Sequence, residues 1–196
     1  MPSQKKQPEK EYTQEDLAIL AVGLAGQLGW PDVRLSDIAE EAGITLAQLS
    51  RHFRDKISVL CAYGRYVDYR TLEQCEHVDP EVSPRDRLFD IMMARFDVLN
   101  EQREGVSSIL HSLKSEPKQL VISLPYLGHS MELMLEASGL DANGLRGAVR
   151  VVGLKLIYLK TLKAWLNDES EDMGKTMSAL DKALGKAESF AQQFGL

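Results

Sequence analysis

The chain has 196 residues, of which 44% are hydrophobic and 27% are charged, a balance typical of a folded globular protein. Its length suits one domain of medium size, or a small domain fused to a larger one. The formal net charge of −6 excludes binding to nucleic acid through bulk positive charge. Any contact with DNA must therefore come from a local basic patch.

The first residues and the cysteines indicate the compartment. Residues 1–12 are polar and carry three lysines, so we expect a flexible basic arm there and no signal peptide. No apolar stretch is long enough to cross a membrane. Cys61 and Cys75 are fourteen residues apart on one predicted helix, roughly 21 Å along its axis, which is too far for a mutual disulfide. Two reduced thiols fit the cytoplasmic location that we expect.

The first helix is predicted directly after this arm. Thr13 is a good N-cap, with Asp16 three residues further on, and apolar residues follow at helical spacing. Gly29 and Pro31 end the pattern, so the helix is expected over residues 14–28.

Two short helices are predicted next, over residues 37–42 and 46–53. Ser36 is expected to cap the first of them, and Gly43 separates the two. A longer helix is then expected from residue 56 to about residue 77.

The rest of the chain also has helical spacing, and no stretch shows the alternation expected of a strand. The predicted fold is all-α, with about nine helices. The expected later helices cover residues 84–101, 106–113, 117–137, 142–166 and 172–193. The expected organisation is a basic arm (1–12), a helix-turn-helix module (13–56), a connecting helix (57–78) and a helical ligand-binding and dimerisation domain (84–196).

Two short helices joined through a glycine, behind a third helix, form a helix-turn-helix, whose second short helix enters the major groove of DNA. Glutamine at the start of that helix can pair with adenine, and arginine or lysine can bind phosphates. We predict DNA contacts from the polar residues of this segment, namely Arg34, Thr45, Gln48, Ser50, Arg51, His52 and Lys56. Each residue taken singly also fits a solvated surface, so the prediction depends on their joint spacing.

This segment, about a quarter of the chain, resembles the DNA-binding module of TetR-family transcriptional regulators. The residues that carry the resemblance are Ile38-Ala39, Ala42-Gly43, Thr45, His52-Phe53 and Lys56. The resemblance implies a TetR-like fold, a homodimer and ligand-responsive binding to a double-stranded DNA operator, as a repressor in the commonest case.

A second interpretation stays open, in which the protein binds a lipid or isoprenoid and carries a degenerate helix-turn-helix. The TetR family often has Lys where this chain has Leu46, and usually Tyr where it has Ser50. Residues 1–78 carry nine Lys and Arg against twelve Asp and Glu. The run around Trp165 is also similar to the end of ubiquinone-biosynthesis lipid-binding proteins, which share the TetR fold.

The last two helices have the apolar spacing of a coiled-coil seam. We predict that they form a four-helix interface with a second copy of the chain. The predicted dimerisation residues are Val149, Val152, Leu156, Leu159, Met177, Leu180, Leu184, Ala187 and Ala191. The alternative is that both seams pack inside one monomer.

Methionine and aromatic residues are frequent in the middle helices, which suits an adaptable cavity for a small apolar ligand. The candidate ligand-binding residues are Met92, Phe96, His111, Tyr126, His129, Met134, Tyr158 and Trp165. Ordinary core packing is the alternative for most of them. The histidines lack partners at metal-ligand spacing and no catalytic motif is present, so we expect no metal, no cofactor and no enzyme.

Overall fold

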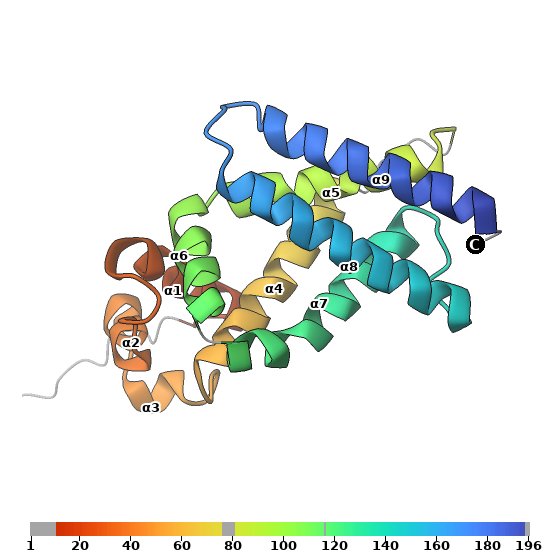
Figure 1. Cartoon of the computed structure of the whole chain (residues 1–196). Coiled ribbons are helices and arrows are strands. Elements are labelled where there is room, and N and C mark those ends of the chain that lie inside the picture. Colours follow the sequence, from red (N-terminus) through yellow and green to blue (C-terminus); the bar gives the residue numbers. More distant parts are fainter. Residues whose placement is uncertain (1–10, 76–80, 116, 195–196) are drawn as a thin grey trace, which may run out of the picture.

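Figure 1 shows the computed structural model of the chain, which describes residues 11–75, 81–115 and 117–194. Every regular element within these ranges is a helix, which confirms the predicted all-α fold. The helices are α1 (Gln14–Leu28), α2 (Leu35–Ala42), α3 (Leu46–Leu49), α4 (Lys56–Gln74), α5 (Pro84–Asn100), α6 (Arg103–Ser115), α7 (Pro117–Ala137), α8 (Gly144–Leu166) and α9 (Gly174–Phe194). Most of the expected arm, and residues 76–78 of the expected connecting helix, lie outside the described residues.

Several predicted boundaries are wrong: α6 begins at Arg103 rather than at residue 106, α4 ends at Gln74, and α8 and α9 each begin two residues later than predicted. In the two short helices, local hydrogen bonds explain the differences. Helix α2 begins at Leu35, because Asp37 accepts the backbone N–H of Arg34 at 2.8 Å and takes the capping role expected of Ser36. Helix α3 ends at Leu49 and does not reach residue 53. Beyond it, the chain tightens into a turn in which the N–H of His52 donates to the carbonyl of Leu49 at 2.9 Å.

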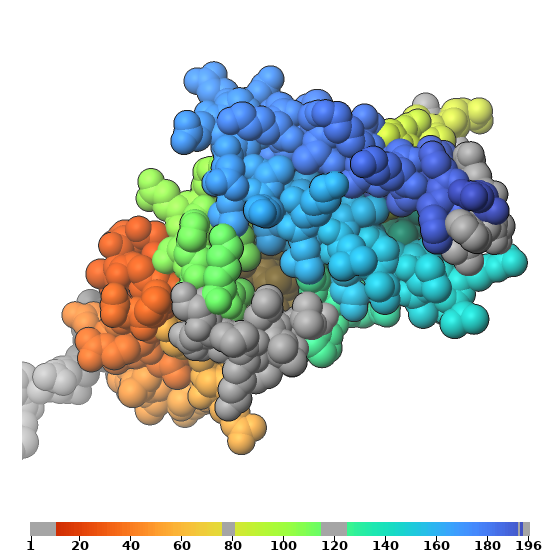
Figure 2. Space-filling model, in the orientation of Figure 1, coloured from red at the N-terminus to blue at the C-terminus, as the bar shows by residue number. Residues whose placement is uncertain are grey.

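The helices form a small module of α1–α3 at one end and a larger body of α5–α9, and α4 runs from the module into the body (Figure 1). A single hydrophobic core is continuous through both parts. Helices α8 and α9 lie side by side and cover one face of the body, as Figure 2 shows. No helix in the described ranges is both long and apolar enough to pass through a membrane.

Helices α1 and α6 approach each other more closely than side chains would allow. A Cβ atom added at Gly105 of α6 would lie 1.9 Å from the carbonyl oxygen of Val22 of α1. A Cβ added at Gly26 would lie 3.2 Å from the backbone nitrogen of Gly105. In the loop after α1, the N–H of Trp30 donates to the hydroxyl of Ser108 of α6 at 2.8 Å. The module is thus held against the body by backbone contact.

A buried polar group joins three helices of the core. Arg95 of α5 donates to the Asp68 carboxylate of α4, and the Ser130 hydroxyl of α7 donates to the second oxygen of that carboxylate at 2.7 Å. All three residues are buried. Burying charge is costly unless it is paired and hydrogen-bonded, and here both conditions are met.

The turn between α8 and α9 is organised around Asp168, which is buried. One carboxylate oxygen accepts the N–H and hydroxyl of Thr176 at 2.7 and 2.8 Å, and the other accepts the N–H of Ser170 at 3.2 Å. Arg103 of α6 donates to the backbone carbonyls of Trp165 and Asp168 at 2.5 Å each. These bonds attach the start of α9 to the end of α8 and to α6.

Replacement of Asp168 by Asn should destabilise the protein at neutral pH by on the order of 2 kcal/mol, since several donors would lose a charged acceptor. Burial alone would raise the pKa of Asp168, but hydrogen bonds from Ser170 and Thr176 outweigh it and hold the pKa well below its usual range. The stabilisation is therefore complete above the unfolded-state pKa of about 3.9, and is lost as the pH falls toward the folded-state value.

Denaturant unfolding of the wild type and of Asp168→Asn, at neutral and at acidic pH, measures this effect. The difference between the two proteins should shrink on acidification. Glu171→Gln is the matched control, because Glu171 is an exposed acid in the same turn. An Asp168→Asn variant as stable as Glu171→Gln at neutral pH would contradict the assigned role.

Candidate nucleic-acid interface

The start of α3 is fixed by a capping box between two of the predicted DNA-binding residues. The Thr45 hydroxyl accepts the backbone N–H of Gln48 at 3.2 Å, and Oε1 of Gln48 accepts the backbone N–H of Thr45 at 2.7 Å. These two reciprocal hydrogen bonds satisfy the backbone N–H groups of Thr45 and Gln48 at the start of α3. Thr45 and Gln48 thus set the geometry of the helix that they were predicted to use for DNA.

The turn after α3 is held by α1. The amide of Gln14 donates to the backbone carbonyl of His52 at 2.9 Å and accepts from Arg65 of α4 at 2.8 Å. The Ser50 hydroxyl donates back to the carbonyl of Ala47 at 2.8 Å. Ser50 and the His52 backbone therefore contribute to the local shape of the module.

Several acidic residues of the module lie at helix N-termini. Asp16, Asp37 and Asp55 accept backbone N–H groups at the starts of α1, α2 and α4. The hydrogen bond from the Arg34 backbone lowers the pKa of Asp37. Carboxylates are favourable at these positions because helix N-termini are electropositive. Three of the acidic residues counted in the sequence thus have a structural role in capping helices.

Three exposed arginines lie on the segment that contains α2 and α3. Arg51 and Arg54 follow α3 directly, are exposed, and form no ion pair with any residue in the described ranges. Arg34, at the start of α2, is also exposed and lies 3.6 Å from the Asp37 carboxylate. These side chains can bind phosphate without breaking a buried contact.

Lys56 is placed differently from the other predicted DNA-binding residues. Its ammonium group lies 4.5 Å from the ring centroid of Trp30 and donates to the backbone carbonyls of Trp30 and, at 3.4 Å, Pro31. It therefore attaches the start of α4 to the loop between α1 and α2. Sequence reasoning missed this contact because Trp30 and Lys56 are far apart in the chain, and no local spacing connects them.

The predicted ligand-binding residues fall into two groups. Five are buried in the core of the body, where the Phe96 ring lies 5.6 Å from Tyr158 and 6.5 Å from Trp165; they are Met92, Phe96, Met134, Tyr158 and Trp165. Three are exposed, namely His111, Tyr126 and His129. Nδ1 of His111 is 2.7 Å from the carbonyl of Ser107 in its own helix.

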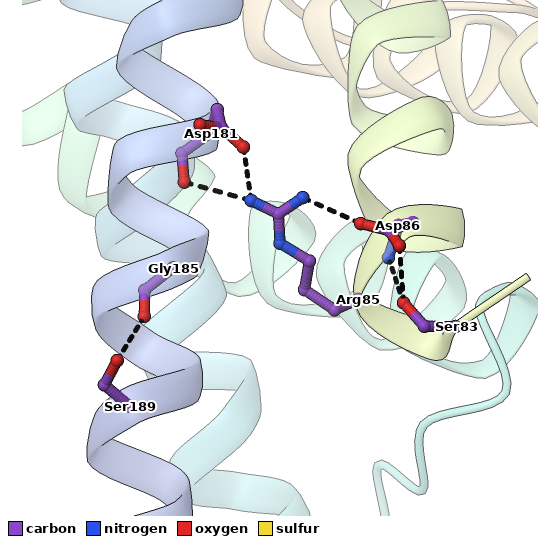
Figure 3. Close-up of polar contacts among 6 residues, drawn as sticks. All are labelled: Ser83, Arg85, Asp86, Asp181, Gly185 and Ser189. Atoms are coloured by element: carbon purple, nitrogen blue, oxygen red, sulfur yellow. Dashed lines mark hydrogen bonds and ion pairs between the residues drawn. The ribbon is translucent and has the colours of Figure 1, made fainter.

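An apolar hollow of about 480 Å³ lies elsewhere, among α5, α7, α8 and α9. Its lining includes Leu88, Leu135, Val149, Leu154 and Leu184, and none of the eight predicted ligand residues, all of which are described. At its edge, Arg85 of α5 bridges Asp86, at 2.8 Å, and Asp181 of α9 (Figure 3). The lining residues come from four different helices, so no short sequence motif predicts this hollow.

The predicted dimerisation residues differ in how far they are exposed to solvent. On α8, an apolar stripe is exposed to solvent, with Leu156 64% exposed. This α8 stripe consists of Leu145, Val149, Val152, Leu156 and Leu159. On α9, Met177 and Ala187 are exposed and Ala191 is half-buried, whereas Leu180 and Leu184 are buried within the chain.

Within the described residues, no three His, Cys, Asp or Glu side chains are arranged to hold a metal ion. Cys61 and Cys75 are both free, and burial raises the pKa of each thiol.

Comparison with solved structures identifies the architecture. A TetR transcriptional regulator from Nitrosomonas europaea matches with a TM-score of 0.74 and 24% identity, over 91% of this chain and 99% of that one. The chain has the TetR fold. The same fold is found in a TetR-family regulator from Streptomyces coelicolor, with a TM-score of 0.59 and 17% identity over 93% of this chain and 87% of that one. It is also found in a TetR-family regulator from Rhodococcus sp., with a TM-score of 0.56 and 21% identity over 88% of this chain and 97% of that one. No family model and no curated protein matches the sequence.

Within this TetR fold, α2 and α3 are the helix-turn-helix that the sequence predicted, and they lie at the exposed end of the module (Figure 1). At these identities the likeness is one of fold, and it does not assign the roles of individual side chains.

Lys56→Met should lower the free energy of unfolding by about 1–2 kcal/mol, because the Trp30 carbonyl loses a charged donor and the ring loses its cation. Arg51→Met is the control, since an exposed side chain without an ion pair should change stability by less than about 0.5 kcal/mol. Denaturant unfolding measures both variants. If Lys56→Met is as stable as the wild type, the lysine does not hold α4 to the loop.

Proposed function

We propose that this protein is a DNA-binding transcriptional regulator of the TetR type that acts as a homodimer and responds to a small ligand. The observation that carries the proposal is the capped, exposed helix-turn-helix in a chain whose fold matches a TetR regulator at a TM-score of 0.74. Such a protein works on DNA in the cytoplasm and needs no catalytic group.

In the proposed complex, α3 enters the major groove and the exposed arginines around it bind phosphates. Arg51 and Arg54 are suited to this role by their exposure and by the lack of an ion pair within the described residues. Gln48 both caps α3 and faces the base edges at its start, so a single side chain would link helix geometry to base preference. Lys56 contributes by holding α4 in place.

Arg51→Ala should weaken binding to all duplexes alike and reduce the slope of log affinity against log salt by about 0.9, the value expected for one lost phosphate contact. Gln48→Glu keeps the acceptor of the capping box and should shift base preference toward cytosine at the contacted position. Fluorescence anisotropy with duplexes from the promoter of the protein's own gene, at several salt concentrations, measures both effects.

The control for these variants is Arg146→Ala, which removes an exposed arginine of α8 and should leave binding unchanged. If the wild type binds none of these duplexes, or binds them with no dependence on salt, the proposed DNA-binding function is wrong.

A homodimer is proposed because two recognition helices must reach successive major grooves about 34–36 Å apart. The α8 stripe supports it, since its members recur at alternating intervals of four and three residues and lie exposed. Contiguous exposed apolar surface of this kind is typical of an interface. The exposed Met177 and Ala187 of α9 are proposed to belong to the same interface. Leu180 and Leu184 are buried and pack within one chain.

Leu156→Glu should convert the dimer to a monomer at micromolar concentration, because it would bury two charges at the centre of a symmetric interface. Leu28→Glu, at an exposed apolar site at the end of α1, is the matched control and should remain dimeric. Sedimentation velocity distinguishes the two states. A monomeric wild type, or a dimeric Leu156→Glu, would contradict this interface.

Ligand response is proposed to act through α4, because this helix leaves the module at Lys56 and reaches the buried Asp68 in the body. A coupling of about 1–3 kcal/mol between ligand and operator would be sufficient for regulation. The lipid-binding alternative has no comparable support, since the solved structures described above are all named as transcriptional regulators.

A further inference from the structure

The exposed side of α3 carries apolar side chains. Leu46 and Ala47 are both exposed, and Leu46 has 51% of its surface open to solvent. Leu49 of the same helix is fully buried in the core, so it is the residue that attaches α3 to the rest of the module. Because α3 lies at the exposed end of the module (Figure 1), Leu46 and Ala47 are available to a partner that approaches from outside.

The polar side chains on and beside α3 already have partners inside the module. Oε1 of Gln48 accepts two hydrogen bonds from Thr45, one from the backbone N–H at 2.7 Å and one from the hydroxyl at 2.9 Å. The hydroxyl of Ser50 donates to the carbonyl of Ala47 at 2.8 Å. A carbonyl oxygen has two lone pairs and a hydroxyl has one hydrogen. The acceptor of Gln48 and the hydroxyl donors of Thr45 and Ser50 are therefore in use.

These internal bonds limit how α3 can read a base sequence. A bidentate pair between glutamine and adenine needs the side-chain oxygen as acceptor for the amino group of the base. In Gln48 that oxygen is occupied by Thr45. The pair with adenine would therefore break the capping box that fixes the start of α3. Readout by apolar contact breaks no internal hydrogen bond.

Thymine is the base that an apolar side chain can recognise in the major groove. Its edge there carries a C5-methyl group, which adenine, guanine and cytosine lack. Burial of that methyl against Leu46 would remove apolar surface of both partners from water, which is favourable. An exposed leucine on a helix that enters the major groove therefore favours thymine over the other bases.

The neighbouring charge favours a DNA duplex as the occupant of this surface. Arg51 and Arg54 follow α3, are exposed, and form no ion pair within the part of the chain that the structure describes. Cationic and apolar side chains thus lie together on one short segment. A duplex presents the matching pair of groups, namely backbone phosphates and the methyl groups of thymine in the major groove.

We infer that Leu46, with Ala47 beside it, contacts thymine methyl groups in the major groove and determines the preference of this chain for thymine at those positions. The inference rests on the proposed DNA-binding function and specifies the bases that α3 reads. Arg51 and Arg54 supply affinity through phosphates, which carry no sequence information.

Duplexes from the promoter of the protein's own gene, prepared once with thymine and once with uracil in its place, test this inference by fluorescence anisotropy. Uracil keeps the hydrogen-bonding groups of thymine and lacks the methyl. We expect uracil to weaken binding about fourfold for each methyl contacted, the factor that corresponds to about 0.8 kcal/mol for one buried carbon, and more than about tenfold when both half-sites of a dimer lose it. Equal affinity for the two duplexes would overturn the inference.

Two leucine variants locate the contact. Leu46→Ala should bind the thymine duplex more weakly and reduce the difference between the two duplexes. The loss should be the same at every salt concentration, because no phosphate contact is removed. Leu28→Ala is the matched control, since Leu28 is 50% exposed at the end of α1, and it should keep the wild-type difference. A thymine preference that is unchanged in Leu46→Ala would place the methyl contact elsewhere and overturn the inference.

The same measurements distinguish failure of this inference from failure of the proposed function. A protein that binds both duplexes equally, with a dependence on salt, would retain the DNA-binding function and lose the thymine readout alone. A protein that binds neither duplex would lose both.

Discussion

The close contact between α1 and α6 determines how the two parts of the molecule relate. Gly105 lies directly against the carbonyl oxygen of Val22, in a space too small for any side chain. Because two backbones meet there, and packed interiors transmit strain, a displacement of α6 is transmitted to α1. The hydrogen bond from Trp30 to Ser108 extends the contact into the loop that precedes the helix-turn-helix. The body therefore sets the orientation of the module.

A second connection runs through α4 and meets the first at Trp30. Lys56, the first residue of α4, donates to the carbonyl of Trp30, whose own N–H is bound to α6. Further along α4, Asp68 is fixed by Arg95 and by a serine of α7. A structural change in the core can therefore reach the loop at Trp30 by two paths, one through α6 and one through α4. Two such paths are what the proposed ligand response would require.

The sequence predicted those features that depend on neighbouring residues. The Thr13 cap, the Gly43 stop and the start of α3 are local, and the structure confirms them. Features that depend on distant residues were not predictable in the same way. Spacing on α9 could not show that Leu180 is covered by its own chain, and the positive charge of Lys56 could not show that Trp30 lies beneath it.

Hydrogen–deuterium exchange of Gly105→Ala tests most directly whether the contact of α1 with α6 holds the module against the body. The control is Gly185→Ala, at a helical glycine with open space around it. If the contact holds the module, the amides of α1, α2 and α3 exchange faster in Gly105→Ala and exchange at an unchanged rate in Gly185→Ala. Equal protection of those three helices in both variants would contradict this role of the contact.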